Sequence, residues 1–239
     1  MPTVPSKPSP LPAKASRVAA PANARKRLGQ QTRERVLEVA TGLVLRKSVS
    51  AMSISELVRV ARVPASSIYW HFGSKEGLVA AAAAVAVERW LALLPDPRTI
   101  PATGEKRVVA AIAGITQALA ADPRTVTLVV KVGVELGEGK HSALAVVRRA
   151  RAEVIDYGIR VFAPAFESVP ARAARAAAER MSAVLMAIAD GIAVNAATHG
   201  QGAAAPDSYR VLGDLAKLLY RGEADALAAR PALTRTRRR

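Results

Sequence analysis

The chain has 239 residues, of which 51% are hydrophobic and only 4% are aromatic, so it can bury a sizeable core. The heavy use of alanine favours closely packed helices and argues against an all-β fold. The formal net charge of +16 points to a polyanionic partner, either nucleic acid or an anionic membrane surface. The lack of cysteine excludes disulfides and thiolate sites, and the lack of a long apolar run predicts a soluble, cytoplasmic protein.

Basic residues concentrate at the two ends of the chain. Residues 1–30 hold six basic and no acidic side chains, and residues 222–239 hold five basic against two acidic. Neither segment has a clear hydrophobic period, so burial cannot offset the entropy of ordering it. We predict two disordered basic tails, which serve either solubility or non-specific attraction to DNA phosphates.

Between these tails the hydrophobic period is helical, and the helices are separated by proline and glycine. Helices are predicted over residues 31–47, from 54 to the turn at 61–63, and over 65–70, 75–94, 105–121, 124–136, 142–162, 172–198 and 208–220. No strand is predicted. The sequence therefore predicts an all-α protein of about nine helices.

The second and third helices have clear start signals and a short turn between them. Ser53 and Glu56 form an S-x-x-E capping box, and Pro64 is suited to the start of the next helix. Two short helices joined by a three- to four-residue turn are typical of a helix-turn-helix unit, which places its last helix in the DNA major groove. The exposed side of that helix is crowded with polar and aromatic groups, namely Ser66, Ser67, Tyr69, Trp70 and His71.

Residues 31–83 resemble the N-terminal DNA-binding domain of the TetR family of bacterial transcriptional regulators. The resemblance is carried by Thr32-Arg-Glu-Arg-Val-Leu, Ser53-Ile-Ser-Glu-Leu-Val and Ser67-Ile-Tyr-Trp-His-Phe-Gly-Ser-Lys-Glu-Gly-Leu78. It implies a three-helix helix-turn-helix domain followed by a larger helical domain, residues 84–221, for ligand binding and dimerisation.

The resemblance also implies which residues contact DNA. Phosphate contacts are expected from Ser53, Tyr69, His71 and Lys75, and base-edge contacts from Ser55, Ala65, Ser66 and Ser67, with Trp70 beside them. Two positions depart from the family pattern: Arg62 replaces a usual glycine, and Pro64 replaces a usual serine. We expect Arg62 to add a phosphate contact. The alternative for Tyr69 and Trp70 is plain packing against the helical bundle.

The larger domain is expected to form a homodimer that reads a palindromic operator. Two apolar stripes suit a four-helix interface: Met181, Val184, Leu185, Ile188 and Ile192 form one, and Leu212, Leu215 and Leu219 belong to the other. The alternative is that these stripes are the core of one subunit. A cavity for a small, apolar effector is expected among Trp90, Leu94, Val132, Tyr157, Phe162 and Met186, for which ordinary core is again the alternative.

Other functions fit the sequence less well. Residues 137–142 resemble part of a phosphate-binding loop but lack its first glycine and its metal-binding hydroxyl, and no metal or cofactor site is predicted, so an enzyme is not expected. A sequence-independent, basic DNA- or membrane-associated protein without an effector is the alternative. We expect a regulator, as a rule a repressor in this family, that leaves its operator when the effector binds.

Overall fold

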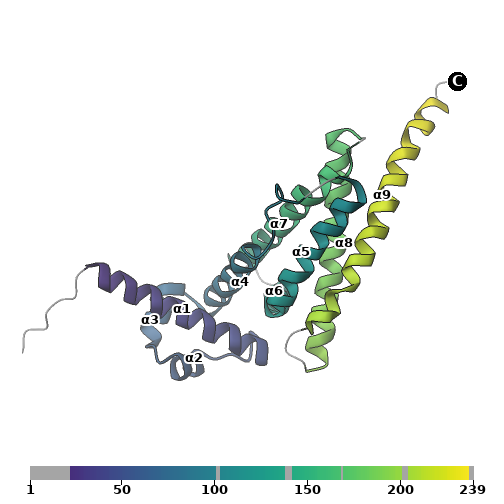
Figure 1. Cartoon of the computed structure of the whole chain (residues 1–239). Helices are drawn as coiled ribbons and strands as arrows, with labels where there is room; N and C mark the ends of the chain where they lie inside the picture. Colours follow the sequence, from purple (N-terminus) through teal and green to yellow (C-terminus); the bar gives the residue numbers. More distant parts are fainter. Residues whose placement is uncertain (1–21, 101–102, 138–141, 168, 201–203, 237–239) are drawn as a thin grey trace, which may run out of the picture.

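The structure is a computed structural model that describes residues 22–100, 103–137, 142–167, 169–200 and 204–236. These residues fold into nine α-helices and two short 3-10 helices, and no strand occurs among them (Figure 1). The predicted all-α class and helix number are therefore confirmed. The first three helices lie at one end of the molecule, and the long helices α8 and α9 run side by side away from them (Figure 1).

The N-terminal domain consists of α1 (Ala22–Arg46), α2 (Ile54–Ala61) and α3 (Ala65–Phe72). Its core is apolar and closed, since Leu43, Leu57 and Ile68 are each at most 1% exposed. The third helix ends at Gly73, whose φ of 73° lies in the region that glycine favours and whose amide donates to the Tyr69 carbonyl. This turn directs the chain straight into α4.

The larger domain contains six helices, namely α4 (Lys75–Leu91), α5 (Gly104–Ala121), α6 (Pro123–Leu136), α7 (Ser142–Phe162), α8 (Ala171–Thr198) and α9 (Val211–Thr236). The 3-10 helices η1 (Ala163–Ala165) and η2 (Pro206–Tyr209) precede α8 and α9. Gly158 allows α7 to lie close to α8, because a Cβ at this position would meet the Ser182 hydroxyl oxygen at 2.3 Å.

Two hydrophobic clusters make up the core, and the boundary between them does not coincide with the boundary between the two domains. The first contains the N-terminal domain together with Leu78, Leu128 and Val132, so α4 and α6 complete the core of the helix-turn-helix. The second joins α5, α7, α8 and α9 around Phe162 and Met181. The helices α4 and α6 therefore connect the two halves of the molecule.

Both ends of the helical region extend further than the sequence indicated. The first helix begins at Ala22 rather than at residue 31, and its added turns are built from residues with good helix propensity. The segment 1–30, predicted to be a disordered tail, is thus helical from residue 22, while residues 1–21 lie outside the described part. The fourth helix ends at Leu91, three residues before the predicted end.

The last helix starts at Val211 rather than 208 and continues through Gly222, so the predicted tail at 222–239 is helical as far as Thr236. One glycine costs a helix only about 1 kcal/mol, and tertiary contacts offset this. Glu223 pairs with Arg180 of α8, Arg221 pairs with Glu105 of α5, and Leu227 is buried.

Candidate DNA-binding surface and ligand cavity

The third helix has one buried and one exposed face. Ile68 is 1% exposed, whereas Tyr69 is 49% and Trp70 80% exposed, and Ser66 is exposed beside them. Ala65, Ser67 and His71 lie at the edge of this face and are half-buried. An exposure of 80% means that Trp70 packs on little but the edge of His71, whose ring centroid is 4.6 Å away. The alternative of plain packing therefore does not account for Trp70.

The start of α2 is fixed by its cap. The Ser53 hydroxyl accepts a hydrogen bond from the Glu56 amide at 3.1 Å, as predicted, and both Ser53 and Ser55 are exposed. The Glu56 carboxylate does not close the second half of the capping box, because it accepts from the Lys47 ammonium at 2.9 Å instead. The dipole of α2 stabilises an anion near this N-terminus.

Arg62 occupies the turn between α2 and α3 in the left-handed conformation, with φ 55° and ψ 43°. It is the one non-glycine residue with positive φ in the described part of the chain. Glycine adopts this conformation without strain, whereas a residue with a Cβ does not. The side chain of Arg62 is exposed, so the strained backbone presents a guanidinium group to solvent.

Lys75, expected to contact phosphate, also has a structural role. Its ammonium group donates to the carbonyl oxygens of Ser50 at 3.2 Å and Met52 at 3.3 Å. These bonds hold the segment between α1 and α2 against the start of α4. An ammonium group has three N–H donors, so one remains for a phosphate oxygen.

Two side chains of α6, Lys131 and Glu135, form hydrogen bonds to the same segment. The sequence did not indicate these contacts. The Lys131 ammonium donates to the carbonyl oxygen of Leu45 at 2.8 Å and to that of Val44 at 3.4 Å, near the C-terminus of α1. The Glu135 carboxylate accepts from the amides of Val49 and Ser50, each at 3.0 Å. A cation at a helix C-terminus and an anion on two amides are both favourable, so α6 holds the end of α1 from two sides.

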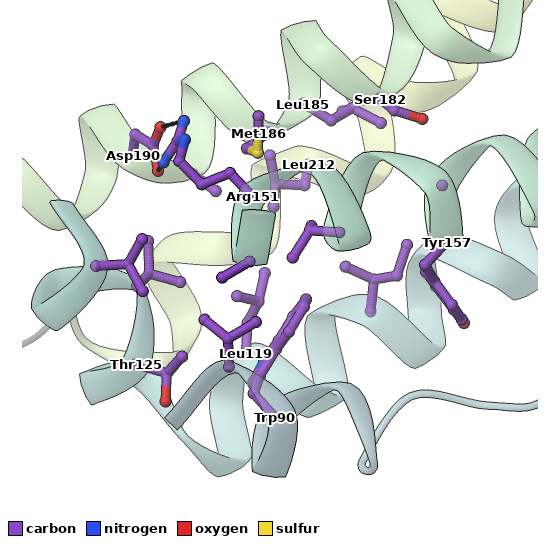
Figure 2. Close-up of a pocket in the computed structure, with 18 of the residues that line it drawn as sticks. Trp90, Leu119, Thr125, Arg151, Tyr157, Ser182, Leu185, Met186, Asp190 and Leu212 are labelled. Carbon is purple, nitrogen blue, oxygen red and sulfur yellow. Dashed lines mark hydrogen bonds and ion pairs between the residues drawn. The ribbon is translucent and has the colours of Figure 1, made fainter. Parts of the chain in front are cut away.

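A cavity of about 100 Å³ lies in the larger domain and is lined by residues of α4 to α9 (Figure 2). Most of the lining is aliphatic or aromatic. Of the predicted ligand residues, Trp90, Tyr157, Phe162 and Met186 line it, whereas Leu94 and Val132 do not. Val132 instead belongs to the core cluster that joins α6 to the N-terminal domain.

One ion pair lies in the cavity wall. The guanidinium of Arg151 on α7 bonds both carboxylate oxygens of Asp190 on α8, at 3.2 and 2.5 Å, and Figure 2 shows the two side chains pointing toward each other. At another part of the wall, the Tyr157 hydroxyl donates to the Pro95 carbonyl at 2.9 Å. Burial raises the pKa of Tyr157 to about 12.

The outer faces of α8 and α9 carry exposed apolar side chains. Val184 is 42%, Val194 44%, Val211 47% and Leu218 62% exposed, and a Cβ at Gly191 of the same surface would meet nothing within 4 Å. By contrast, the predicted interface residues Met181, Leu185 and Leu212 are buried inside one subunit. Ile188, Ile192, Leu215 and Leu219 are partly buried against the same core.

Met181, Leu185 and Leu212 are thus core residues of one subunit, which was the alternative for the predicted stripes. The other five predicted residues keep some exposed surface, and their place in a dimer interface stays a prediction.

No group of three or more His, Asp or Glu side chains that could hold a metal ion occurs in the described residues. Most of the segment that resembles part of a phosphate-binding loop, residues 138–141, lies outside them. α8 is long and apolar enough to cross a membrane by composition, with 33% of its most apolar window buried. Core helices of soluble proteins have the same composition, and α8 packs against α6, α7 and α9.

The family model described as "Bacterial regulatory proteins, tetR family" matches residues 36–82. The HTH-type transcriptional regulator AcrR of Shigella flexneri is 40% identical over 53 residues, which are 22% of this chain and 25% of that protein. The matched region thus spans about a quarter of the length of this relative.

Solved structures extend the similarity to the whole fold. A TetR-family regulator from Agrobacterium tumefaciens matches 81% of this chain and 98% of its own, with a TM-score of 0.59 and 18% identity. A putative transcriptional regulator from Pseudomonas aeruginosa PAO1 matches 83% of this chain and 94% of its own, with a TM-score of 0.63 and 19% identity. At such low identity these matches show a shared fold.

Proposed function

We propose that the protein, whose residues 36–82 match the TetR family, is a homodimeric, sequence-specific transcriptional regulator. The proposal includes a repressor mode, in which a small molecule in the cavity of the larger domain releases the operator. The main observation in support of this proposal is the position of α6. This helix lines the cavity and also forms hydrogen bonds to the end of α1 and the segment after it in the DNA-binding domain.

DNA recognition is assigned to the exposed face of α3 and the groups around it. Ser66 and Trp70 face solvent and are suited to base edges and thymine methyl groups in the major groove. The N-terminus of α2 with Lys75 beside it, and Arg62 in the turn between α2 and α3, are suited to phosphate oxygens on either side of the groove.

Dimerisation is assigned to the exposed apolar face of α8 and α9. Val184, Val194, Val211 and Leu218 would be buried if these two helices packed against the same helices of a second copy, giving a four-helix bundle. Burial of this face also accounts for the low burial of the apolar window of α8 without a membrane. A symmetric dimer then presents two α3 helices to two half-sites.

The effector acts through α6 in this proposal. Thr125, Val126 and Val129 line the cavity, and Lys131 and Glu135 hold the end of α1 on the same helix. A ligand that moves α6 therefore moves the DNA-binding domain of its subunit and changes the separation of the two α3 helices. Release requires that the ligand binds the non-DNA-binding arrangement more tightly.

The experiment is a selection of binding sites for the full-length protein from random double-stranded DNA. We expect the recovered sites to share a palindrome with half-sites about one DNA turn apart, or a multiple of it. Ser66→Ala should change the preferred sequence, whereas Lys75→Ala should weaken binding to every sequence and reduce its salt dependence. Recovered sequences without a common motif would favour the alternative of a sequence-independent basic protein.

A further inference from the structure

The polar groups of the cavity wall are few, and most of them are already bonded. The Thr125 hydroxyl donates to the Asp122 carboxylate at 2.6 Å, and the Ser182 hydroxyl donates to the Ala178 carbonyl at 2.7 Å. The Tyr157 hydroxyl donates to Pro95. The protons of these three hydroxyls are therefore committed within the protein, and none of them is free to donate to a ligand.

The indole N–H of Trp90 is the exception. Trp90 is 6% exposed and lines the cavity, and its Nε1 has no hydrogen-bond partner among the described residues. An indole nitrogen is only a donor, and a buried donor without an acceptor is costly. Trp90 is therefore a lining residue that holds one buried donor without an acceptor.

The charges of the cavity wall cancel. Arg151 and Asp190 are its charged residues, and each neutralises the other. A guanidinium has five N–H groups, of which two are bonded to Asp190 in this geometry, so this side also has donor capacity left beside the spare lone pairs of the carboxylate. A charged ligand would lose its hydration without gaining an unpaired counter-charge.

We propose that the cavity binds an uncharged, mainly apolar molecule whose hydrogen-bond acceptor, such as a carbonyl or ester oxygen, takes the Trp90 N–H. The volume of about 100 Å³ is smaller than the roughly 150 Å³ of an engineered cavity that accepts benzene, so a ligand with one substituted ring requires the lining to move outward. This inference rests on the proposed function, because it names the class of molecule that acts as effector.

The test uses four ligands with the same ring and calorimetric titration of the full-length protein at neutral pH. Methyl benzoate is an uncharged acceptor, benzoate is an anion, benzylamine is a cation, and ethylbenzene has no acceptor. We expect methyl benzoate to bind at least about tenfold more tightly than each of the other three. In Trp90→Phe its affinity should fall to that of ethylbenzene, whose own affinity should stay unchanged.

A second variant tests the charge balance separately. Asp190→Asn keeps a hydrogen-bond acceptor for Arg151 but leaves one net positive charge in the wall, so benzoate should gain about tenfold or more in affinity. The matched control is Glu153→Gln, which removes an exposed carboxylate from α7 outside the cavity and should change no affinity.

The inference is overturned if benzoate or benzylamine binds the wild type as tightly as methyl benzoate, if Trp90→Phe leaves the order of affinities unchanged, or if none of the four binds. DNA binding of the unliganded protein is measured separately and tests the proposed function. If methyl benzoate binds with the expected selectivity but leaves DNA affinity unchanged, the ligand class holds and the effector role fails.

Discussion

Glu135 offers the sharpest test of the connection between α6 and the DNA-binding domain. Glu135→Ala removes the acceptor of two amide hydrogen bonds, from Val49 and Ser50. A hydrogen bond to a charged group contributes about 1.5 to 3 kcal/mol, but Ser50 is exposed and water can replace its partner. We therefore expect a loss of about 2 kcal/mol, mostly from the partly buried Val49 amide.

Native-state hydrogen exchange measures this loss at the amide itself. Protection of the Val49 amide should fall by roughly thirtyfold, which corresponds to about 2 kcal/mol. Amides in the middle of α8, far from the substitution, should keep their protection as long as the variant is folded. The matched control is Glu153→Ala, which breaks an exposed pair with Arg149 on α7 and should leave Val49 unchanged. Unchanged protection of the Val49 amide in Glu135→Ala would refute the idea that Glu135 holds the segment after α1.

Three further predictions concern single side chains. Tyr209 is fully buried and its hydroxyl has no partner among the described residues, so Tyr209→Phe should raise the free energy of unfolding by about 1 kcal/mol in urea denaturation; a clear loss would mean that the hydroxyl is bonded. The left-handed backbone conformation of Arg62 costs about 1 kcal/mol in a residue with a Cβ, so Arg62→Gly should raise the melting temperature. The same change should weaken binding to all DNA sequences alike, because it removes a cation. A lower melting temperature would contradict this. Because burial raises the pKa of Tyr157 to about 12, the unfolded chain loses this proton first, near pH 10, so stability should fall as pH rises from about 10 to about 12. Absorbance titration of Tyr157→Phe should then lack one ionisation near pH 12, and loss of an ionisation near pH 10 instead would contradict the burial.

The helix-turn-helix could be predicted closely because its boundaries depend on local signals. Ser53 caps α2, Pro64 precedes α3, and Gly73 and Ser74 separate α3 from α4. Each of these residues acts on the backbone within a few positions, so a single sequence contains the information. The identity of the exposed face of α3 followed from Ile68 and the residues around it for the same reason.

The rest depended on contacts between distant parts of the chain. Glu135 and Val49 are 86 residues apart, and nothing in the sequence around either one shows the contact. The apolar stripe of α8 is wide, and only the packing of α6, α7 and α9 decides that Met181 is inside and Val184 outside. Likewise, α9 passes Gly222 because Arg180 and Glu105 pair with neighbouring residues of that helix.

We propose above that the exposed face of α3 reads a specific DNA sequence. Its most direct test is fluorescence anisotropy of the full-length protein with a selected palindrome and with scrambled DNA of the same composition, at matched physiological salt. We expect the palindrome to bind at least about a thousandfold more tightly than the scrambled DNA. Equal affinities for the two DNAs would contradict it.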